Sequence, residues 1–208
     1  PYAPTLDFAR YSTYHGKTVS NSHPVIGIHQ RLVKNRYPGR LLLKFEPQVI
    51  DVPAKYALVV EQPQLYQFTI NGKEIKFEGK EHYRDQSFRV QDISGTLKQG
   101  TNEILLSLNY LAPEPSSLNA IKRYGTEIES IYLTGDFGVA VTPSLNSIIK
   151  SQKYSDKLLV EKPVYTISRF AITKENKTFE NDLVTSGYPF YAGSFVLNNS
   201  FKIEKIAA

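Results

Sequence analysis

The chain of 208 residues carries a formal net charge of +5, and 41% of its residues are hydrophobic and 22% charged. This balance supports a buried core and excludes a disordered chain, and no apolar run approaches the roughly 20 residues that span a membrane. The absence of cysteine excludes disulfides, Cys-ligated zinc, thiol catalysis and iron–sulfur clusters. The lysines are scattered, without a dense basic block or an RNA-binding aromatic motif, so we expect no nucleic-acid partner.

The beginning of the chain is polar, and we expect a loop-rich segment over residues 1–38. It shows no charged stretch followed by an apolar one, as a signal peptide would. Because the first residue is Pro1 and not methionine, we expect a mature protein, a trimmed chain or a fragment.

Two strands follow. Residues 39–50 predict a strand with Leu41, Leu43 and Phe45 on one face, since alternate side chains of a strand share a face. Residues 55–63 predict a strand that is apolar on both faces, which is typical of a central position in a sheet.

Residues 67–77 predict a β-hairpin around Asn71-Gly72, a pair that favours the left-handed conformations of a type I′ turn. In that register Ile70 faces Lys73, and the inward face holds five large apolar side chains, namely Tyr66, Phe68, Ile70, Ile75 and Phe77. Alternation of this kind indicates a half-buried antiparallel sheet.

The next elements are a polar loop at 79–86, a strand beginning at 87 and a strand at 101–110. A loop with one helical turn is expected at 111–127, followed by two strands at 128–143 that join at Gly135-Asp136. Residues 144–158 are weakly patterned, and we then expect a strand at 164–173 and a turn with two short strands at 186–206. Short strands separated by turn residues, with almost no helical periodicity, indicate an all-β sandwich or barrel. We expect one domain over 1–208, with the sandwich at 39–208.

Residues 87–108 also contain a structural signature. Gly100 suits a positive φ before a strand, Asn102 suits hydrogen bonds to the backbone at the strand entry, and Asp92 suits a cap for the turn at 93–97. These roles are architectural and carry no chemistry of their own.

Together with Asn71-Gly72, the Asp92-Ile93 pair and the stretch Leu97–Ile104 resemble the galactose-binding-like jelly-roll domains found beside the catalytic domains of glycoside hydrolases. The segments "IESIYLTGDFGV" and "SGYPFYAGSFVL" are similar to parts of family-106 α-L-rhamnosidases of gut Bacteroidetes. The resemblance implies an antiparallel β-sandwich of jelly-roll topology and a link to carbohydrate. The chain is far shorter than those enzymes and has no pattern for a (β/α)₈ catalytic barrel.

The stretch "EHYRDQ" offers the first candidate ligand-binding residues, which are His82, Tyr83, Arg84 and Asp85. An aromatic face, a fork of donors and an acceptor are the groups that bind sugars, because C–H faces stack on aromatics and hydroxyls need donors and acceptors. The alternative is a surface loop with an Arg–Asp pair of small energetic value.

A second candidate is "GYPFYAG", where Tyr188 and Tyr191 are predicted stacking platforms. The alternative is that Phe190 and a tyrosine plug the end of the sandwich. The absence of tryptophan, a frequent sugar platform, counts against a stand-alone lectin.

Catalytic and metal chemistry have weaker signals. No spacing forces together two of the carboxyls that a glycosidase needs, the candidates being Glu61, Asp85, Glu127, Glu129 and Asp136. The four histidines have no zinc-ligand spacing. We therefore expect no complete catalytic site and no cofactor, while a structural calcium ion held by carbonyls and Asp or Asn side chains stays open.

The sequence thus predicts a non-catalytic carbohydrate-binding or accessory β-sandwich of a bacterial glycoside hydrolase, exported to the periplasm, the cell surface or the medium. Its expected partners are a carbohydrate and a catalytic domain of the same parent protein. Two alternatives stay open: a glycosidase fragment that contributes to an active site only with a missing catalytic domain, and a structural or adhesive sandwich without sugar binding.

Overall fold

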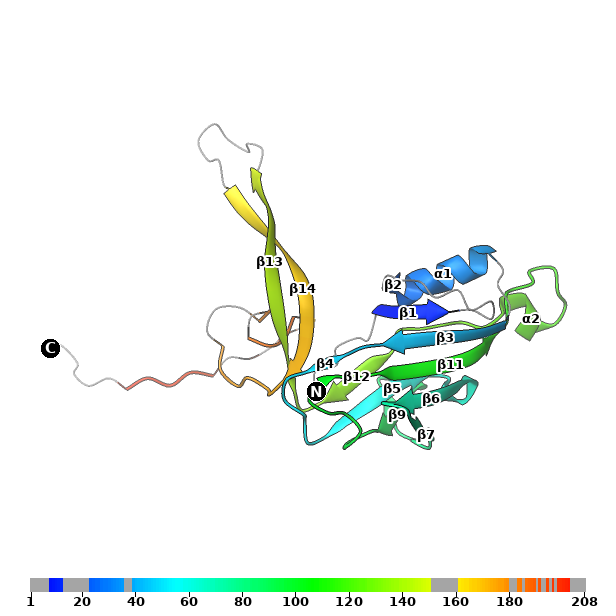
Figure 1. Ribbon diagram of the computed structural model, residues 1–208, viewed down its shortest axis with the longest axis horizontal. Helices are drawn as coiled ribbons and strands as arrows, with labels where there is room; N and C mark the ends of the chain where they lie inside the picture. Colours follow the sequence, from blue (N-terminus) through cyan, green and yellow to red (C-terminus); the bar gives the residue numbers. More distant parts are fainter. Residues whose placement is uncertain are drawn as a thin grey trace.

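The computed structural model describes residues 8–12, 23–35, 39–150, 161–179, 183–184, 186–189, 191, 194, 196 and 198–202; of 8–12, 23–24, 35, 143–150 and 161–169 it describes the backbone alone. The described chain forms three sheets, two α-helices and one short 3-10 helix (Pro63–Leu65), so the all-β prediction is confirmed. Figure 1 shows two of the sheets facing each other in a sandwich, with α1 beside one edge and α2 on a projecting loop.

The first face of the sandwich is a six-stranded sheet of order β2-β1-β3-β11-β6-β7. Its neighbouring strands all run antiparallel. The strands are β1 (Phe8–Ser12), β2 (His23–Pro24), β3 (Gly39–Phe45), β6 (Tyr66–Ile70), β7 (Lys73–Ile75) and β11 (Ile104–Tyr110). As predicted, Leu41, Leu43 and Phe45 of β3 share the buried face.

The opposing face is a four-stranded antiparallel sheet of order β12-β5-β9-β8. Its strands are β5 (Tyr56–Glu61), β8 (His82–Tyr83), β9 (Asp85–Asp92) and β12 (Tyr132–Gly135). The prediction that the 55–63 strand is central is confirmed, because β5 lies between β12 and β9. Its Leu58, Val59 and Val60 are all buried.

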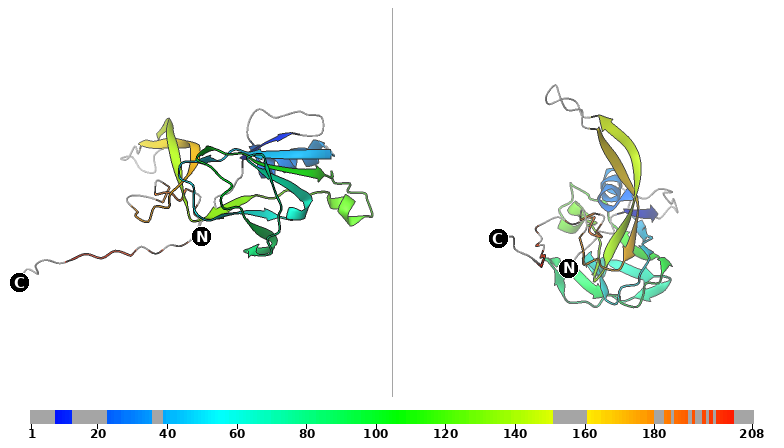
Figure 2. Two further views of the ribbon diagram at one scale, coloured as in Figure 1. Left: turned by 60° about the horizontal axis from the view of Figure 1, so that its bottom comes forward. Right: turned by 90° about the vertical axis from the view of Figure 1, so that its left-hand side faces the viewer.

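The third sheet has the order β10-β4-β14-β13. Its strands are β4 (Gln48–Val49), β10 (Gly100–Thr101), β13 (Gly138–Lys150) and β14 (Glu161–Thr173). Here β13 and β14 form a long antiparallel ribbon that rises away from the sandwich (Figures 1 and 2), while β14 pairs in parallel with β4 at the ribbon's base. The ribbon contains the strand predicted at 164–173 and also extends through part of the weakly patterned 144–158 segment.

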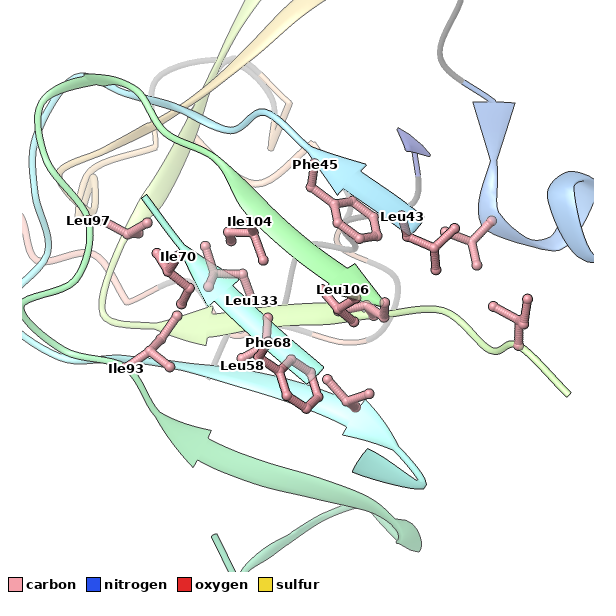
Figure 3. Close-up of a cluster of buried hydrophobic side chains, with 14 of the residues drawn as sticks. Leu43, Phe45, Leu58, Phe68, Ile70, Ile93, Leu97, Ile104, Leu106 and Leu133 are labelled. Atoms are coloured by element: carbon pink, nitrogen blue, oxygen red, sulfur yellow. The ribbon is translucent and has the colours of Figure 1, made fainter. Parts of the chain in front are cut away.

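The core lies between the two faces of the sandwich. Figure 3 shows side chains of β3, β6 and β11 pointing toward those of β5 and β12. Ile104 and Leu106 have no exposed surface, and Leu58 and Leu133 of the opposing sheet are 1% exposed. Burial of these large apolar side chains is the main favourable contribution to folding.

The hairpin forms in the predicted register. Ile70 pairs with Lys73 and Phe68 with Ile75, while Asn71 and Gly72 have φ of 50° and 80°. Phe77 lies beyond β7, but its ring centroid is 5.2 Å from that of Phe68, so it packs against the same cluster.

Asn102 connects this hairpin to the loop before β11. Its buried Oδ1 accepts from Lys98 N (2.8 Å) and from Asn71 Nδ2 (2.8 Å), and its Nδ2 donates to the Lys98 and Gly100 carbonyls. Asp92 Oδ1 accepts from Ser94 N at 2.8 Å, so both predicted structural roles are confirmed, as is the positive φ of Gly100.

Three segments differ from the sequence expectation. The loop-rich beginning contains β1, β2 and α1 (Val25–Asn35), whose Val25, Ile28 and Leu32 are buried in the core. The prediction of a loop at 79–86 is partly wrong, because β8 and the start of β9 lie within this range. Among the described residues of 186–202 there is no strand, so the two predicted there are not seen in that part.

The α2 helix (Ala120–Tyr124) confirms the helical turn predicted within 111–127. Asn119 caps it, its Oδ1 accepting from Lys122 N at 3.2 Å. Thr126 closes the loop, because its N donates to the Leu111 carbonyl and its Oγ1 accepts from Leu111 N. The loop is thus held at its neck and displays α2 at its tip.

Candidate functional site

An open groove of ≈ 890 Å³ lies on the outer face of the β12-β5-β9-β8 sheet. Its walls come from the segment before β8, from the β12 end and from the turn before β5. Its lining consists of Lys55, Tyr56, Ala57, Glu78, Gly79, Lys80, Glu81, His82, Tyr83, Val90, Gln91, Asp92, Ser94, Thr134, Gly135 and Asp136.

The floor of the groove follows from strand register. Ala57 pairs with Thr134 on one side and Asp92 on the other, which places the three in one row across the sheet. The adjacent row on the same face contains Tyr132, Val59 and Val90, of which Val90 lines the groove while Val59 is fully buried. The floor is therefore apolar at its centre and polar at its edges.

The wall formed by residues 78–83 is fixed against β9. Gln91 Oε1 accepts from Glu78 N at 2.7 Å and from Gly79 N at 2.9 Å, and its Nε2 donates to the Asp92 carbonyl. A Cβ on Gly79 would lie 1.7 Å from the Val90 carbonyl oxygen, so only glycine permits this close approach.

Charged groups of both signs line the groove: two lysine ammonium groups, Lys55 and Lys80, and four carboxyls, Glu78, Glu81, Asp92 and Asp136. The hydroxyl and the backbone N–H of Ser94 both bond to Asp92, and they lower the pKa of that carboxyl. Asp136 N donates to the Lys55 carbonyl at 3.3 Å, which fixes one end of the groove.

His82 and Arg89 brace the wall. His82 Nδ1 is 2.8 Å from the Gln86 carbonyl, and since a carbonyl only accepts, Nδ1 carries the proton. Nε2 then accepts from Arg89 Nη1 at 3.1 Å, and Arg89 also donates to the Lys80 carbonyl at 2.9 Å. Both ring nitrogens of His82 are engaged, so its role is to shape the groove.

Tyr83 contributes the aromatic side of the groove. Its ring centroid lies 6.3 Å from that of Tyr132, which in turn meets Phe88 edge-on at 5.8 Å. The Arg84 guanidinium lies 5.7 Å from the Tyr83 ring centroid, within cation–π range. Tyr83 is thus a ring of the groove lining that is held by its contacts with Tyr132 and Arg84.

The structure places the other predicted residues differently. Asp85 Oδ1 accepts from Ser87 N (2.8 Å) and from Ser87 Oγ (2.7 Å), which lowers its pKa and commits it to the turn before β9. Arg84 and Asp85 thus both have structural contacts, and neither lines the groove.

Tyr188 and Tyr191 do not line it either. The Tyr188 ring stacks on Phe179 at 5.6 Å, and its hydroxyl is within hydrogen-bond distance of the Glu175 carboxylate and the Asn176 carbonyl. Tyr191 donates to the Ser194 carbonyl and is 39% exposed. Phe190, the predicted plug, lies outside the described residues.

The acidic candidates fall into two places. Asp136 lines the groove, whereas Glu61 interacts electrostatically with Glu129, Glu127 and Asp85. Burial, followed by the charges of Glu129 and Glu127, raises the pKa of Glu61. Burial also raises the pKa of Tyr66, with Glu61 as the next cause.

Sequence reasoning missed several groove residues. Thr134 lines the groove from within a segment predicted only as strand, so strand alternation was the one available signal for the face on which it lies. No local pattern pointed to Gly79 or Gln91, because their contacts depend on how β9 packs against the preceding segment.

Within the described part of the chain, no group of three His, Asp or Glu side chains is placed to hold a metal ion. The calcium ion that the sequence left open stays a prediction. No helix in that part is long and apolar enough to cross a membrane.

No family model and no curated protein matches the sequence. Solved glycoside hydrolases resemble the fold, each at low identity. A β-D-mannosidase from Dictyoglomus thermophilum aligns with a TM-score of 0.46 and 12% identity, covering 83% of this chain and 31% of that one. A GH2 β-galacturonidase from Eisenbergiella tayi gives 0.43 and 13%, covering 82% and 35%.

A β-D-glucuronidase from Dictyoglomus thermophilum gives a TM-score of 0.40 and 16% identity, covering 70% of this chain and 30% of that one. The chain therefore spans about a third of the length of these enzymes. At these identities and TM-scores the likeness is no evidence of a shared activity. The likeness to family-106 α-L-rhamnosidases is not among these comparisons and stays a prediction.

Proposed function

We propose that the chain is a non-catalytic carbohydrate-binding β-sandwich of an exported bacterial glycoside hydrolase, and that it binds a glycan in the groove on the β12-β5-β9-β8 sheet. The observation that carries the proposal is the groove itself, with Tyr83, Ala57 and Val90 in its lining and donors and acceptors around them.

This arrangement suits a sugar for a physical reason. A sugar ring has apolar C–H faces that stack on an aromatic ring, and its hydroxyls each need donors and acceptors. Lys55 and Lys80 supply donors, and Glu78, Glu81 and Asp136 supply acceptors. The wall is fixed by Gln91 and Gly79, so the site needs little reorganisation when a ligand binds.

The proposal assigns no catalytic step to this chain. A glycosidase needs a carboxyl whose pKa is raised so that it acts as a general acid. In the groove, Asp92 shows the opposite, since Ser94 lowers its pKa. Glu61, whose pKa is raised, does not line the groove.

A second candidate function is docking on a catalytic domain of the parent protein. The loop that carries α2 exposes Leu118, Ile121 and Tyr124, whose exposed fractions are 96%, 71% and 74%. Clusters of large exposed apolar side chains mark interaction sites. In hydrogen exchange, residues 117–125 are expected to gain protection in a parent protein that carries the catalytic domain, and equal exchange would reject this role.

A purely structural or adhesive sandwich is the third reading. A structural or adhesive role does not require a groove with an aromatic side chain in its lining and a fixed wall. We therefore rank it below the two binding roles. It predicts no saturable glycan binding.

The experiment that tests the proposal is a glycan-array screen of the chain, covering rhamnose-, galactose- and uronate-containing oligosaccharides. Binding to at least one glycan class is expected, with the signal lost in Tyr83→Ala and kept in Tyr124→Ala. Tyr124 is the matched control because it is an exposed tyrosine on α2, outside the groove. Silence across the array would contradict the proposal.

A further inference from the structure

A second depression, of ≈ 400 Å³, lies at the strand ends of the six-stranded sheet, where β3 begins, β11 ends and β6 begins. We call it the Arg40 pocket. Its lining consists of Arg40, Gln64, Leu65, Tyr66, Gln67, Ser107, Leu108 and Asn109. None of these residues lines the groove of the opposing sheet.

Strand register brings the polar members together. Arg40 pairs directly with Asn109, and Ser107, two residues before Asn109 on the same face, pairs with Gln67. Polar side chains of β3, β11 and β6 therefore lie in two neighbouring rows of the outward face, opposite the apolar inward face, and Leu42 is the β3 member of the Ser107–Gln67 row.

The Ser107–Gln67 pair orients the guanidinium of Arg40. Arg40 Nη2 donates to Ser107 Oγ at 3.2 Å, and Ser107 Oγ donates to Gln67 Oε1 at 3.3 Å. Ser107 is only 7% exposed, so the first hydrogen bond of the guanidinium is made to a buried hydroxyl.

Arg40 is the single charged residue lining the pocket. No carboxylate in the described part of the chain forms an ion pair with it. Four of the five N–H donors of a guanidinium therefore remain for a ligand, in the planar fork that matches a carboxylate. Gln64, Gln67 and Asn109 add amide donors and acceptors beside it.

We propose that the Arg40 pocket is a second binding site, separate from the groove, and that it takes the carboxylate of a hexuronic acid. The fork of Arg40 binds the carboxylate, and the side-chain amides bind the ring hydroxyls. Leu65, which is 43% exposed, offers an apolar contact for a ring C–H face. Uronic acids and sulfated sugars share one chemistry, an oxyanion on a polyhydroxylated ring. The test therefore compares a uronic acid with a sulfated sugar.

The test is a ¹H–¹⁵N NMR titration of the chain with four probes: glucuronate, glucose, glucose 6-sulfate and inorganic sulfate, each at concentrations up to about 50 mM, a range suited to millimolar affinity. Glucuronate is expected to give saturable shifts at the Ser107 and Asn109 amides. Glucose and inorganic sulfate are expected to bind at least tenfold more weakly.

Arg40→Gln is expected to weaken glucuronate binding at least tenfold, and Arg40→Lys several-fold, because an ammonium lacks the planar fork. Lys73→Gln removes a charge from the same sheet, outside the pocket, and is expected to change nothing. Equal binding of glucose or inorganic sulfate, preference for glucose 6-sulfate, or unchanged binding in Arg40→Gln would each overturn the proposal. Groove binding of Tyr83-dependent glycans is a separate measurement and is unaffected by these outcomes.

Discussion

Gly79 shows how a single residue sets the shape of the groove. Its backbone lies so close to β9 that a Cβ would reach to 1.7 Å from the Val90 carbonyl oxygen, and Gln91 holds it there. The contact is to backbone, which cannot rotate away as a side chain does. Any larger residue must therefore push the 78–83 wall off the sheet.

Gly79→Ala is expected to lower the free energy of unfolding by about 1–3 kcal/mol, the usual cost of forcing an extra methyl group into a packed position. Urea denaturation measures it. Glu78→Ala, which removes an exposed neighbouring side chain, is the control and is expected to stay within about 0.5 kcal/mol of the unsubstituted chain. Equal stability of the two variants would contradict the close contact.

Glu61 gives a pH-dependent prediction. Its pKa is raised in the folded chain by burial and by Glu129 and Glu127, so folding favours its protonated form. The contribution of protonated Glu61 to folding stability is fully present below its pKa in the unfolded chain. It is lost as the pH rises through its pKa in the folded chain.

Glu61→Gln, which stays neutral, is therefore expected to raise the Tm by about 1–2 °C at pH 7, corresponding to a few tenths of a kcal/mol. The difference is expected to shrink near pH 4. Calorimetry at both pH values measures it. A larger increase in Tm at pH 4 than at pH 7 would contradict a raised pKa for Glu61.

At the scale of elements, helix α1 closes an edge of the sandwich with one apolar stripe. Val25, Ile28 and Leu32 recur at helical spacing and are at most 1% exposed, whereas Ile26 is 59% exposed. Lys34 in the last turn interacts favourably with the helix dipole.

Ile28→Ala is expected to cost about 2–4 kcal/mol of unfolding free energy, because it leaves a cavity in the core. Ile26→Ala deletes the same atoms on the exposed side of the same helix and is expected to cost less than about 1 kcal/mol. Chemical denaturation of the pair isolates burial from helix propensity. Similar losses of unfolding free energy in both variants would contradict the packing of α1 against the core.

The sequence predicted the elements whose signals are local. The register around Asn71-Gly72, the central strand at 55–63 and the buried roles around Asn102 all depend on alternation or turn chemistry within a few residues. Helix α1 was missed although its 25, 28, 32 spacing was present, because Gly27 and β-branched neighbours are weak helix formers. The β8–β9 pairing was missed because β8 has only two residues, which are too few to show alternation.

The candidate site was predictable only in part. His82 and Tyr83 line the groove, as an aromatic and polar segment suggested, while Arg84 and Asp85 do not. Tyr188 and Tyr191 do not meet them in the groove, because adjacency between segments more than 100 residues apart depends on packing and not on local pattern.

At the scale of the whole molecule, the two faces of the sandwich differ in chemistry. One outer face carries the groove, lined by both signs of charge and by Tyr83, and the other carries the Arg40 pocket, whose lining has a single cation. Two such sites on opposing sheets would let one domain contact a glycan at two points. Under the two proposals, the sandwich is a scaffold that positions binding groups on its surface.

The most direct test of the central claim is calorimetric titration of the best array glycan into the unsubstituted chain, Tyr83→Ala and Tyr124→Ala. Tyr83→Ala is expected to lose at least tenfold in affinity, about 1.4 kcal/mol, because it removes the stacking ring. Tyr124→Ala is expected to match the unsubstituted chain. Unchanged affinity in Tyr83→Ala would contradict the claim that the groove is the glycan site.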